Sequence, residues 1–360
     1  MAVARSEIGV ASGRVMTVLG PLPVEDLGIT LVHEHTLVDG GINGPEPAEA
    51  SKKHLFHRPL TLEVLTDVRE RPQANRDNQR LGDISLAARE LRKYGSLGGR
   101  TIVEPTLEGI GRDPVGVQQV SRRSGVNIIL GAGYFIELSH PPRLRGMSAD
   151  DIADDVVRDV IEGIPGTGVR AGVIGEIGVD NDFTAEEAKN LRGASRASRR
   201  TGVPLSIHTS GASAPGTRRR ILDIVEEEGA DIRHTMIDHV SLRPSDFETH
   251  LEVARRGAFL GYDTIGSDYN WGSRGSGRCD HEIAAEIRRM IDAGFVDQIL
   301  VSSDVHMKVM LTAYGGGGYG YILRTFLPTL REQGVTEEQI ATILVRNPRR
   351  YFSSTHRDAH

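Results

Sequence analysis

The hydrophobic pattern of the chain alternates between short apolar runs and longer stretches in which apolar residues recur with a helical period. The short runs predict buried strands, and the amphipathic stretches predict helices that pack on them. The predicted strands cover Ile29–His35, Thr101–Pro105, Asn127–Phe135, Ala171–Val179, Pro204–Ser210, His234–Val240, Ala258–Ile265 and Ile299–Val305. The predicted helices cover 84–95, 113–124, 148–162, 184–200, 216–228, 244–256 and 280–293. Ser148 and Thr184 are suited to capping the helices that they precede.

This order of elements predicts an α/β fold of the (β/α)8 barrel type, also called a TIM barrel. An open doubly wound sheet is the alternative, but it needs a glycine-rich turn after the first strand, where this chain has His-Glu-His-Thr. Residues 13–27 predict a short hairpin ahead of the barrel, and the long 40–80 excursion predicts either a functional loop or a disordered segment. The predicted domains are an N-terminal extension with the hairpin at 1–28, the barrel at 29–352 and a tail at 353–360.

Imidazole and carboxylate side chains stand near the ends of five predicted strands. His33 and His35 are two residues apart, so they point the same way on a strand, while Glu34 points the opposite way. Four more strand ends carry the residues Glu176, His208, His239 and Asp304. Each of these six alone is more simply explained as a hydrogen-bonded polar group at a strand end. The carboxyl ends of barrel strands converge on one mouth, however, so together they predict a metal site.

Six nitrogen and oxygen ligands are too many for one tetrahedral ion and suit two divalent ions that share a bridge. Glu176 and Asp304 are the candidate bridges, since a carboxylate can offer one oxygen to each ion. Such ligands suit zinc, manganese or cobalt. A metal pair of this kind activates water and polarises a carbonyl or phosphoryl oxygen, and Asp304 could accept the proton of the attacking hydroxide.

Composition narrows the class of partner. The 43 basic and 49 acidic residues give a net charge of −6, which argues against nucleic acid as a partner. No apolar run approaches the ~18 residues of a membrane span, and the first residues lack the apolar core of a signal peptide. Cys279 is the single cysteine, so no intrachain disulfide can form. These features predict a cytoplasmic protein that acts on a small molecule.

Several stretches together resemble the phosphotriesterase family of the amidohydrolase superfamily, from about Gly13 to Phe352. They are Gly13-Arg-Val-Met-Thr-Val-Leu-Gly-Pro, Thr30-Leu-Val-His-Glu-His, Thr101-Ile-Val-Glu, Gly109-Ile-Gly-Arg-Asp, Leu205-Ser-Ile-His-Thr, Ile237-Asp-His, Ser302-Ser-Asp and Asn347-Pro-Arg-Arg-Tyr-Phe. The stretch Gly317-Gly-Tyr-Gly-Tyr is similar to the phosphotriesterase homology branch.

The resemblance implies a binuclear metal-dependent hydrolase. It implies that His33, His35 and Asp304 hold the more buried metal, that His208 and His239 hold the more exposed one, and that a hydroxide bridges them. In the founding enzymes the strand-four bridge is a carboxylated lysine. This chain has no lysine between Lys93 and Lys189 and offers Glu176 instead, as the homology branch does. A homodimer is a further implication of the resemblance.

The resemblance leaves the substrate open. We expect attack on an ester or lactone carbonyl. The alternatives are an N-acyl amide, a phosphotriester, or a barrel that binds a ligand without catalysis. Five residues are candidate substrate contacts, each with packing or a surface loop as the simpler alternative: Tyr134, Phe135, Trp271, Arg274 and His306. Asp263 could accept a hydrogen bond from a ligand histidine or serve a purely structural role.

Overall fold

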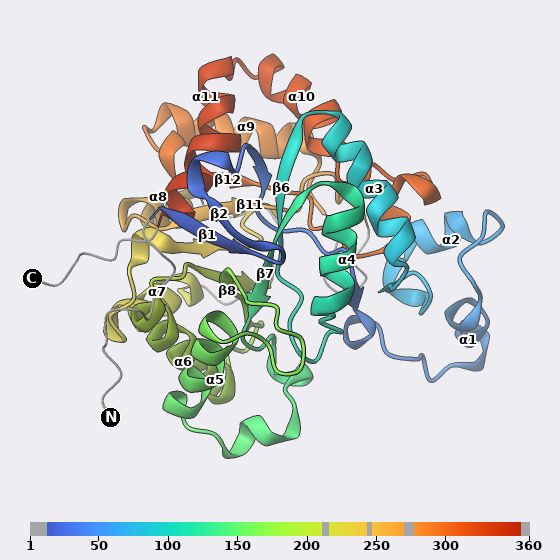
Figure 1. The fold of residues 1–360 in the computed structure, drawn as a ribbon. Helices are drawn as coiled ribbons and strands as arrows, with labels where there is room; N and C mark the ends of the chain where they lie inside the picture. Colours follow the sequence, from blue (N-terminus) through green and yellow to red (C-terminus); the bar gives the residue numbers. More distant parts are fainter. Residues whose placement is uncertain (1–12, 211–215, 243–246, 270–276, 354–360) are drawn as a thin grey trace, which may run out of the picture.

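Eight parallel strands form the central sheet of the computed structural model, which describes residues 13–210, 216–242, 247–269 and 277–353 (Figure 1). The strands pair in the order β12-β11-β10-β9-β8-β7-β6-β3. Beyond the paired residues, the amide of His35 donates to Val305 O at 3.0 Å and the amide of Asp304 donates to His33 O at 3.2 Å. These bonds join the two edges and close the barrel, so the predicted (β/α)8 fold is confirmed. The strands are β3 (Ile29–Leu31), β6 (Gly99–Glu104), β7 (Asn127–Ala132), β8 (Val173–Val179), β9 (Leu205–Thr209), β10 (Thr235–Ile237), β11 (Phe259–Tyr262) and β12 (Ile299–Val301).

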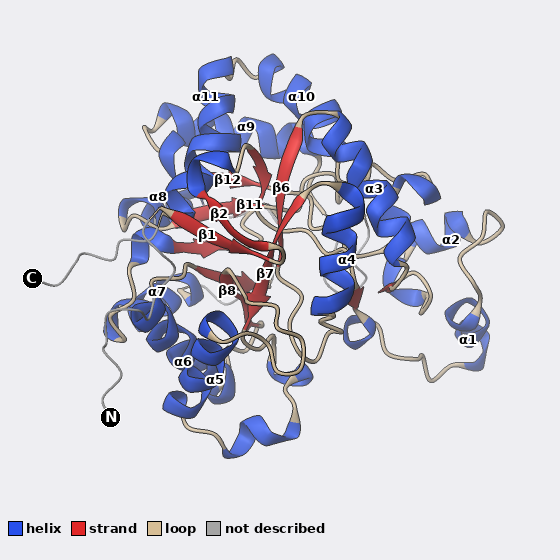
Figure 2. Ribbon diagram, viewed as in Figure 1, coloured by secondary structure: helices blue, strands red, loops and turns tan. Residues whose placement is uncertain are grey.

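Helices surround the strands (Figure 2). Those between successive strands are α3 (Ile84–Ser96), α4 (Pro114–Ser124), α5 (Ala149–Ile161), α6 (Ala185–Thr201), α7 (Thr217–Glu227), α8 (Phe247–Arg255) and α9 (Asp280–Asp292). Three more follow the last strand, namely α10 (Leu327–Glu332), α11 (Glu337–Ala341) and α12 (Asn347–Phe352). Ser148 and Thr184 both form capping boxes, as predicted, and each satisfies amides that the first helical turn leaves unpaired. No helix within the described residues has both the length and the apolar character needed to cross a membrane.

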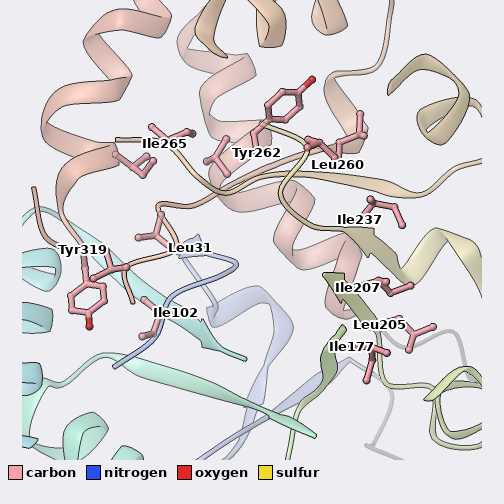
Figure 3. Close-up of a cluster of buried hydrophobic side chains, with 14 of the residues drawn as sticks. Leu31, Ile102, Ile177, Leu205, Ile207, Ile237, Leu260, Tyr262, Ile265 and Tyr319 are labelled. Carbon is pink, nitrogen blue, oxygen red and sulfur yellow. The ribbon is translucent and has the colours of Figure 1, made fainter. Parts of the chain in front are cut away.

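Alternate strand residues belong to two separate apolar clusters. One set packs toward the helices, and Figure 3 labels several of its members, such as Ile102, Ile237 and Leu260. Their sequence neighbours form the other set, which also includes residues of the N-terminal hairpin and of α12: Val15, Leu27, Val103, Ile129, Val173, Met236, Phe259, Leu300, Tyr351 and Phe352. The hairpin and α12 therefore pack against the inner residues, and the carboxyl ends of the strands remain for polar residues.

Most of the strands end earlier than their apolar runs predict. The predicted strands extend to His35, Val240 and Val305, whereas β3, β10 and β12 end at residues 31, 237 and 301. Backbone conformation explains two of these differences, because His239 has a φ of 59° and Asp304 a φ of 49°. Positive φ is costly for a residue with a side chain and cannot continue a strand. His239 and Asp304 thus lie on the turns that leave the barrel.

Two segments outside the barrel are also ordered. The predicted hairpin is confirmed as the antiparallel pair β1 (Arg14–Thr17) and β2 (Gly20–Pro23). The 40–80 excursion is closed at its base by the antiparallel pair β4 (Val38–Asp39) and β5 (Arg80–Leu81). It carries the short helices α1 (Ala50–His57) and α2 (Leu65–Glu70), which Figure 1 draws to one side of the barrel. The excursion is therefore a structured loop at the carboxyl end of the first barrel strand.

Candidate metal centre and active site

The structure brings the six predicted ligand residues together inside the mouth of the barrel. His33 and His35 follow β3, Glu176 lies on β8, His208 lies on β9, and the other two follow β10 and β12. Four of the six are at least 96% buried as side chains, while His208 and Asp304 each expose 15%. Glu34 points the other way, as the strand alternation predicts. Its carboxylate accepts hydrogen bonds from Ser302 Oγ, Ser303 N and Val305 N at 2.8, 2.8 and 2.9 Å.

An irregularity in β8 turns Glu176 inward. On the neighbouring strand β9 the partners Leu205 and Ile207 are two residues apart, but they pair with Ile174 and Ile177, which are three apart. The extra residue lets both isoleucines face the helices while Glu176 points into the barrel. Such bulges commonly re-aim a side chain beside an active site.

The two oxygens of Glu176 face different imidazoles. Its Oε1 lies 3.4 Å from His35 Nε2, and its Oε2 lies 3.0 Å from His208 Nδ1. The same Oε2 lies 3.5 Å from both His33 Nε2 and His239 Nε2. Asp304 Oδ1 lies 3.3 Å from His35 Nε2. One oxygen of Glu176 therefore faces His35 and the other faces His33, His208 and His239, so the carboxylate could offer one oxygen to each of two ions.

Two groups of three residues could each hold a metal ion, because within each group the ligand atoms all lie within 4.8 Å of one another. One consists of His33, His35 and Asp304, and the other of His33, Glu176 and His239. Both ring nitrogens of His33 are buried without a hydrogen-bond partner. A buried unpartnered nitrogen is costly, and a cation at Nε2 would satisfy it. The donor set therefore fits divalent metal ions.

Outer side chains orient the ligand imidazoles. The Thr106 hydroxyl donates to the Glu104 carboxylate and lies 2.7 Å from His35 Nδ1. Since that hydroxyl proton is already used, His35 Nδ1 must donate to Thr106, which leaves the Nε2 lone pair pointing into the centre. His239 Nδ1 lies 3.0 Å from Asp263 Oδ1, so Asp263 contacts a ligand histidine as one of its two predicted roles requires. Such contacts fix the tautomer and raise the basicity of metal ligands.

A third group of possible ligands lies around Nδ1 of His33, the ring nitrogen that does not face Glu176. It consists of His33, Asp238 and Asp263, and the carboxylates approach His33 Nδ1 at 3.5 and 3.6 Å. Both carboxylates are fully buried. Because they face the outer nitrogen, they serve to hold the ring rather than to extend the central cluster.

The pKa shifts of the clustered side chains favour ionised carboxylates and bound cations. Burial alone would raise the pKa of Glu176, but His33 and the neighbouring imidazoles hold it well below its ordinary value. Burial alone would lower the pKa of His35, yet Asp304 and Glu176 raise it to about 9. The pKa of Asp304 is held far below its usual range mainly by His306, against the effect of its own burial. The carboxylates thus stay ionised and attract cations, whether protons or metal ions.

A cavity opens above this cluster. Besides five of the six ligand residues it is lined by apolar side chains and by polar ones: Val38, Ile110, Phe135 and Leu242, and Asn43, Gln73, Thr264, Ser267 and His306. Two of the predicted substrate contacts, Phe135 and His306, are in this lining. The nearest of them to the cluster is His306, whose Nδ1 lies 3.2 Å from Asp304 Oδ1.

The other substrate candidates are placed differently. Tyr134 does not reach the cavity, because its hydroxyl donates to Asp155 at 2.8 Å and its ring lines a separate cavity beside Arg143. Consecutive residues point in opposite directions here, so Phe135 faces the cavity above the predicted ligand residues and Tyr134 faces away. Trp271 and Arg274 lie outside the described residues.

Sequence reasoning missed several contributors to the site. Asn43 and Gln73 belong to the excursion, and nothing in their local sequence distinguishes them from ordinary loop residues. Thr106 and Asp238 had a usable signal, because each lies within two residues of a strand-end motif. Their role depends on which ring nitrogen they meet, and that follows only from the fold.

Comparison with known proteins identifies the family of the chain. Residues 13–352 match the phosphotriesterase family. The N-acetyltaurine hydrolase of Danio rerio is 33% identical over 349 residues, which cover 95% of this chain and 98% of that protein. Relatives of this kind share the whole barrel rather than a fragment of it.

Three solved structures are also similar. The resiniferatoxin-binding protein from Rhodobacter sphaeroides is 44% identical with a TM-score of 0.92, covering 98% of each chain. The phosphotriesterase homology protein from Escherichia coli, in complex with phosphate in its active site, is 26% identical with a TM-score of 0.75, over 91% of this chain and 99% of that one. A lactonase from Listeria monocytogenes is 26% identical with a TM-score of 0.76, over 95% and 99%. The chain therefore belongs to the phosphotriesterase family, and it is a hydrolase.

Proposed function

We propose that this protein is a binuclear metal-dependent hydrolase that cleaves a carboxylic acid derivative. The observation that supports it most is the position of Glu176, whose two oxygens face separate imidazoles at 3.0 to 3.5 Å. In this proposal His33, His35 and Asp304 hold one ion, His208 and His239 hold the other, and Glu176 joins them. Histidine nitrogens and carboxylate oxygens are typical zinc ligands, so Zn²⁺ is the proposed metal, with Mn²⁺ or Co²⁺ compatible.

Two bound divalent cations would supply activation of water and polarisation of the substrate carbonyl. The residues of the chain would supply proton transfer and exclusion of solvent. Asp304 stays ionised because of its lowered pKa, so it is available to accept a proton at Oδ1. His306 Nδ1 lies 3.2 Å from the same oxygen and orients it toward the cavity. Phe135 packs its ring edge-on to His208 at a centroid distance of 4.7 Å and covers the exposed side of the centre.

The relatives favour an N-acyl amide as the substrate. The 33% identical protein is an N-acetyltaurine hydrolase that matches almost the full chain, whereas the lactonase is 26% identical. We therefore place a small N-acyl amide first and the ester or lactone expected from sequence second. A phosphotriester is third, supported by the phosphate in the homology protein.

A substrate panel tests the proposal. The metal-loaded protein is assayed with N-acetyltaurine, a set of lactones and an aryl phosphotriester under identical conditions. Release of free amine at the highest kcat/KM supports the amide, and a higher value for lactones would assign the ester bond instead. A fully metallated protein inert toward all three classes would contradict the proposal and favour a binding role, which the 44% identical structure carries in its name.

A further inference from the structure

Two side-chain carboxamides of the excursion face the active-site cavity. Asn43 and Gln73 both line it, together with Glu176, His208 and Asp304. Both side chains are partly exposed, and neither carboxamide has a hydrogen-bond partner within the described part of the chain. Each offers two N–H donors and one carbonyl acceptor, so both are free to bind a ligand.

A buried glutamine joins the two backbone segments that carry these residues. Gln79 is 2% exposed, and its Nε2 donates to Gln73 O at 2.7 Å and to Gly44 O at 3.3 Å. The backbones of residues 44 and 73 touch so closely that a Cβ on Gly44 would lie 2.3 Å from Gln73 O. Only glycine allows this approach. Because the backbone is fixed, Asn43 and Gln73 are held in place before any substrate binds, which reduces the entropy cost of binding.

The excursion is also anchored to the neighbouring segment that follows β12. The amide of Lys308 donates to Asn78 O at 3.0 Å, and Asn78 Oδ1 accepts from Val309 N at 2.9 Å. Lys308 Nζ lies 2.6 Å from Asp77 Oδ1. These contacts connect the excursion to the segment that follows Asp304. The position of the carboxamides relative to the metal-binding residues is therefore set by direct bonds and not by a free loop.

We propose that Asn43 and Gln73 form a specificity subsite for an oxygen-bearing head group on the leaving amine of the substrate. The inference rests on the proposed amide hydrolase function and names what the site selects. The other described lining side chains, apart from the metal-binding residues, are four apolar groups, two hydroxyls and His306. None of these described lining residues is a lysine or arginine. Within the described lining, the two carboxamides therefore offer most of the N–H donors for sulfonate, carboxylate or hydroxyl oxygens.

Four acetamides with different amines test this subsite. They are N-acetyltaurine, N-acetyl-β-alanine, N-acetylethanolamine and N-ethylacetamide, which carry a sulfonate, a carboxylate, a hydroxyl and no head group. The variants are Asn43→Leu and Gln73→Met, which keep the size of the side chain and remove its hydrogen bonds. Gln119→Met on α4 is the matched control, since its side chain contacts Arg123 on the same helix. Metal content and thermal unfolding are measured for every variant.

We expect KM for the three amides with head groups to rise about tenfold in each subsite variant, with kcat within a factor of about two. The KM for N-ethylacetamide should be unchanged, as should every parameter of the control. Asn43→Asp should weaken the sulfonate and carboxylate substrates more than the hydroxyl one, because it adds a like charge. Equal effects on substrates with and without a head group would overturn the subsite.

Failure of the proposed function gives a different result. If wild-type protein hydrolyses none of the four amides, the amide assignment is wrong. Calorimetric titration of N-acetyltaurine into the metal-loaded protein then tests the subsite separately. Affinity that is about tenfold weaker in Asn43→Leu and Gln73→Met, but not in the control, supports it. Absent binding, or equal affinity in all four proteins, contradicts it.

Discussion

Replacement of Glu176 by glutamine removes one charge from the centre and keeps the shape of the side chain. The carboxylate oxygens of Glu176 lie 3.0 to 3.5 Å from the nitrogens of four imidazoles, so an ion bound by these imidazoles would lie close to the carboxylate charge. One unit charge at about 4 Å is worth about 4 kcal/mol at an effective dielectric constant of about 20. Since about 1.4 kcal/mol is a factor of ten, the metal affinity of Glu176→Gln should fall about 10³-fold.

The assay is competitive titration with a chelator of known affinity, combined with elemental analysis of dialysed protein. Glu187→Gln is the matched control. Glu187 is an equally buried carboxylate that caps α6, and its Oε2 accepts from the amides of Asp180 and Thr184 at 3.2 Å. The control should lose stability and retain two metals per chain. A Glu176→Gln protein with wild-type stoichiometry and affinity would refute the bridging role.

Three further predictions concern the surroundings of the centre. Thr106→Val should weaken metal binding about 10- to 100-fold by leaving His35 Nδ1 without its acceptor, measured by the same chelator competition; unchanged affinity would contradict the tautomer argument. In the metal-free protein the pKa of His35 is raised to about 9, so metal binding at pH 7 should release a proton from this imidazole. The metal affinity should therefore rise with pH up to about 9. Calorimetry in buffers of different ionisation enthalpy measures the released proton, and binding without proton release would refute this prediction. Phe135→Ala should raise KM for the substrate, whereas Tyr134→Ala should not, because the Tyr134 ring lines a separate cavity. Equal rises in KM would place both rings in the active-site cavity.

Much of the fold and of the ligand set could be predicted from sequence because both depend on local periodicity. The alternation of His33, Glu34 and His35 correctly predicted two imidazoles pointing inward and one carboxylate pointing outward. Strand ends were less predictable, since an apolar run does not reveal that His239 and Asp304 adopt positive φ. The apolar positions beyond those turns still pack, so the pattern continues after the hydrogen-bonded strand has ended.

The substrate side of the site could not be predicted for a different reason. Asn43 and Gln73 line the same cavity because Gln79 joins Gly44 to Gln73 and because β4 pairs with β5. Contacts between residues so distant in sequence leave no periodic signal. Tyr134 and Phe135 illustrate the same limit, as their shared position at a strand end did not indicate which one faces the cavity. The expected homodimer, the cytoplasmic location and the domain boundaries stay predictions.

Crystallographic anomalous scattering at the zinc edge, from crystals grown with Zn²⁺, tests the central claim most directly. The account predicts two peaks per chain about 3.5–4 Å apart, with Glu176 contributing one oxygen to each. One peak would contradict it, as would two peaks with Glu176 bound to neither.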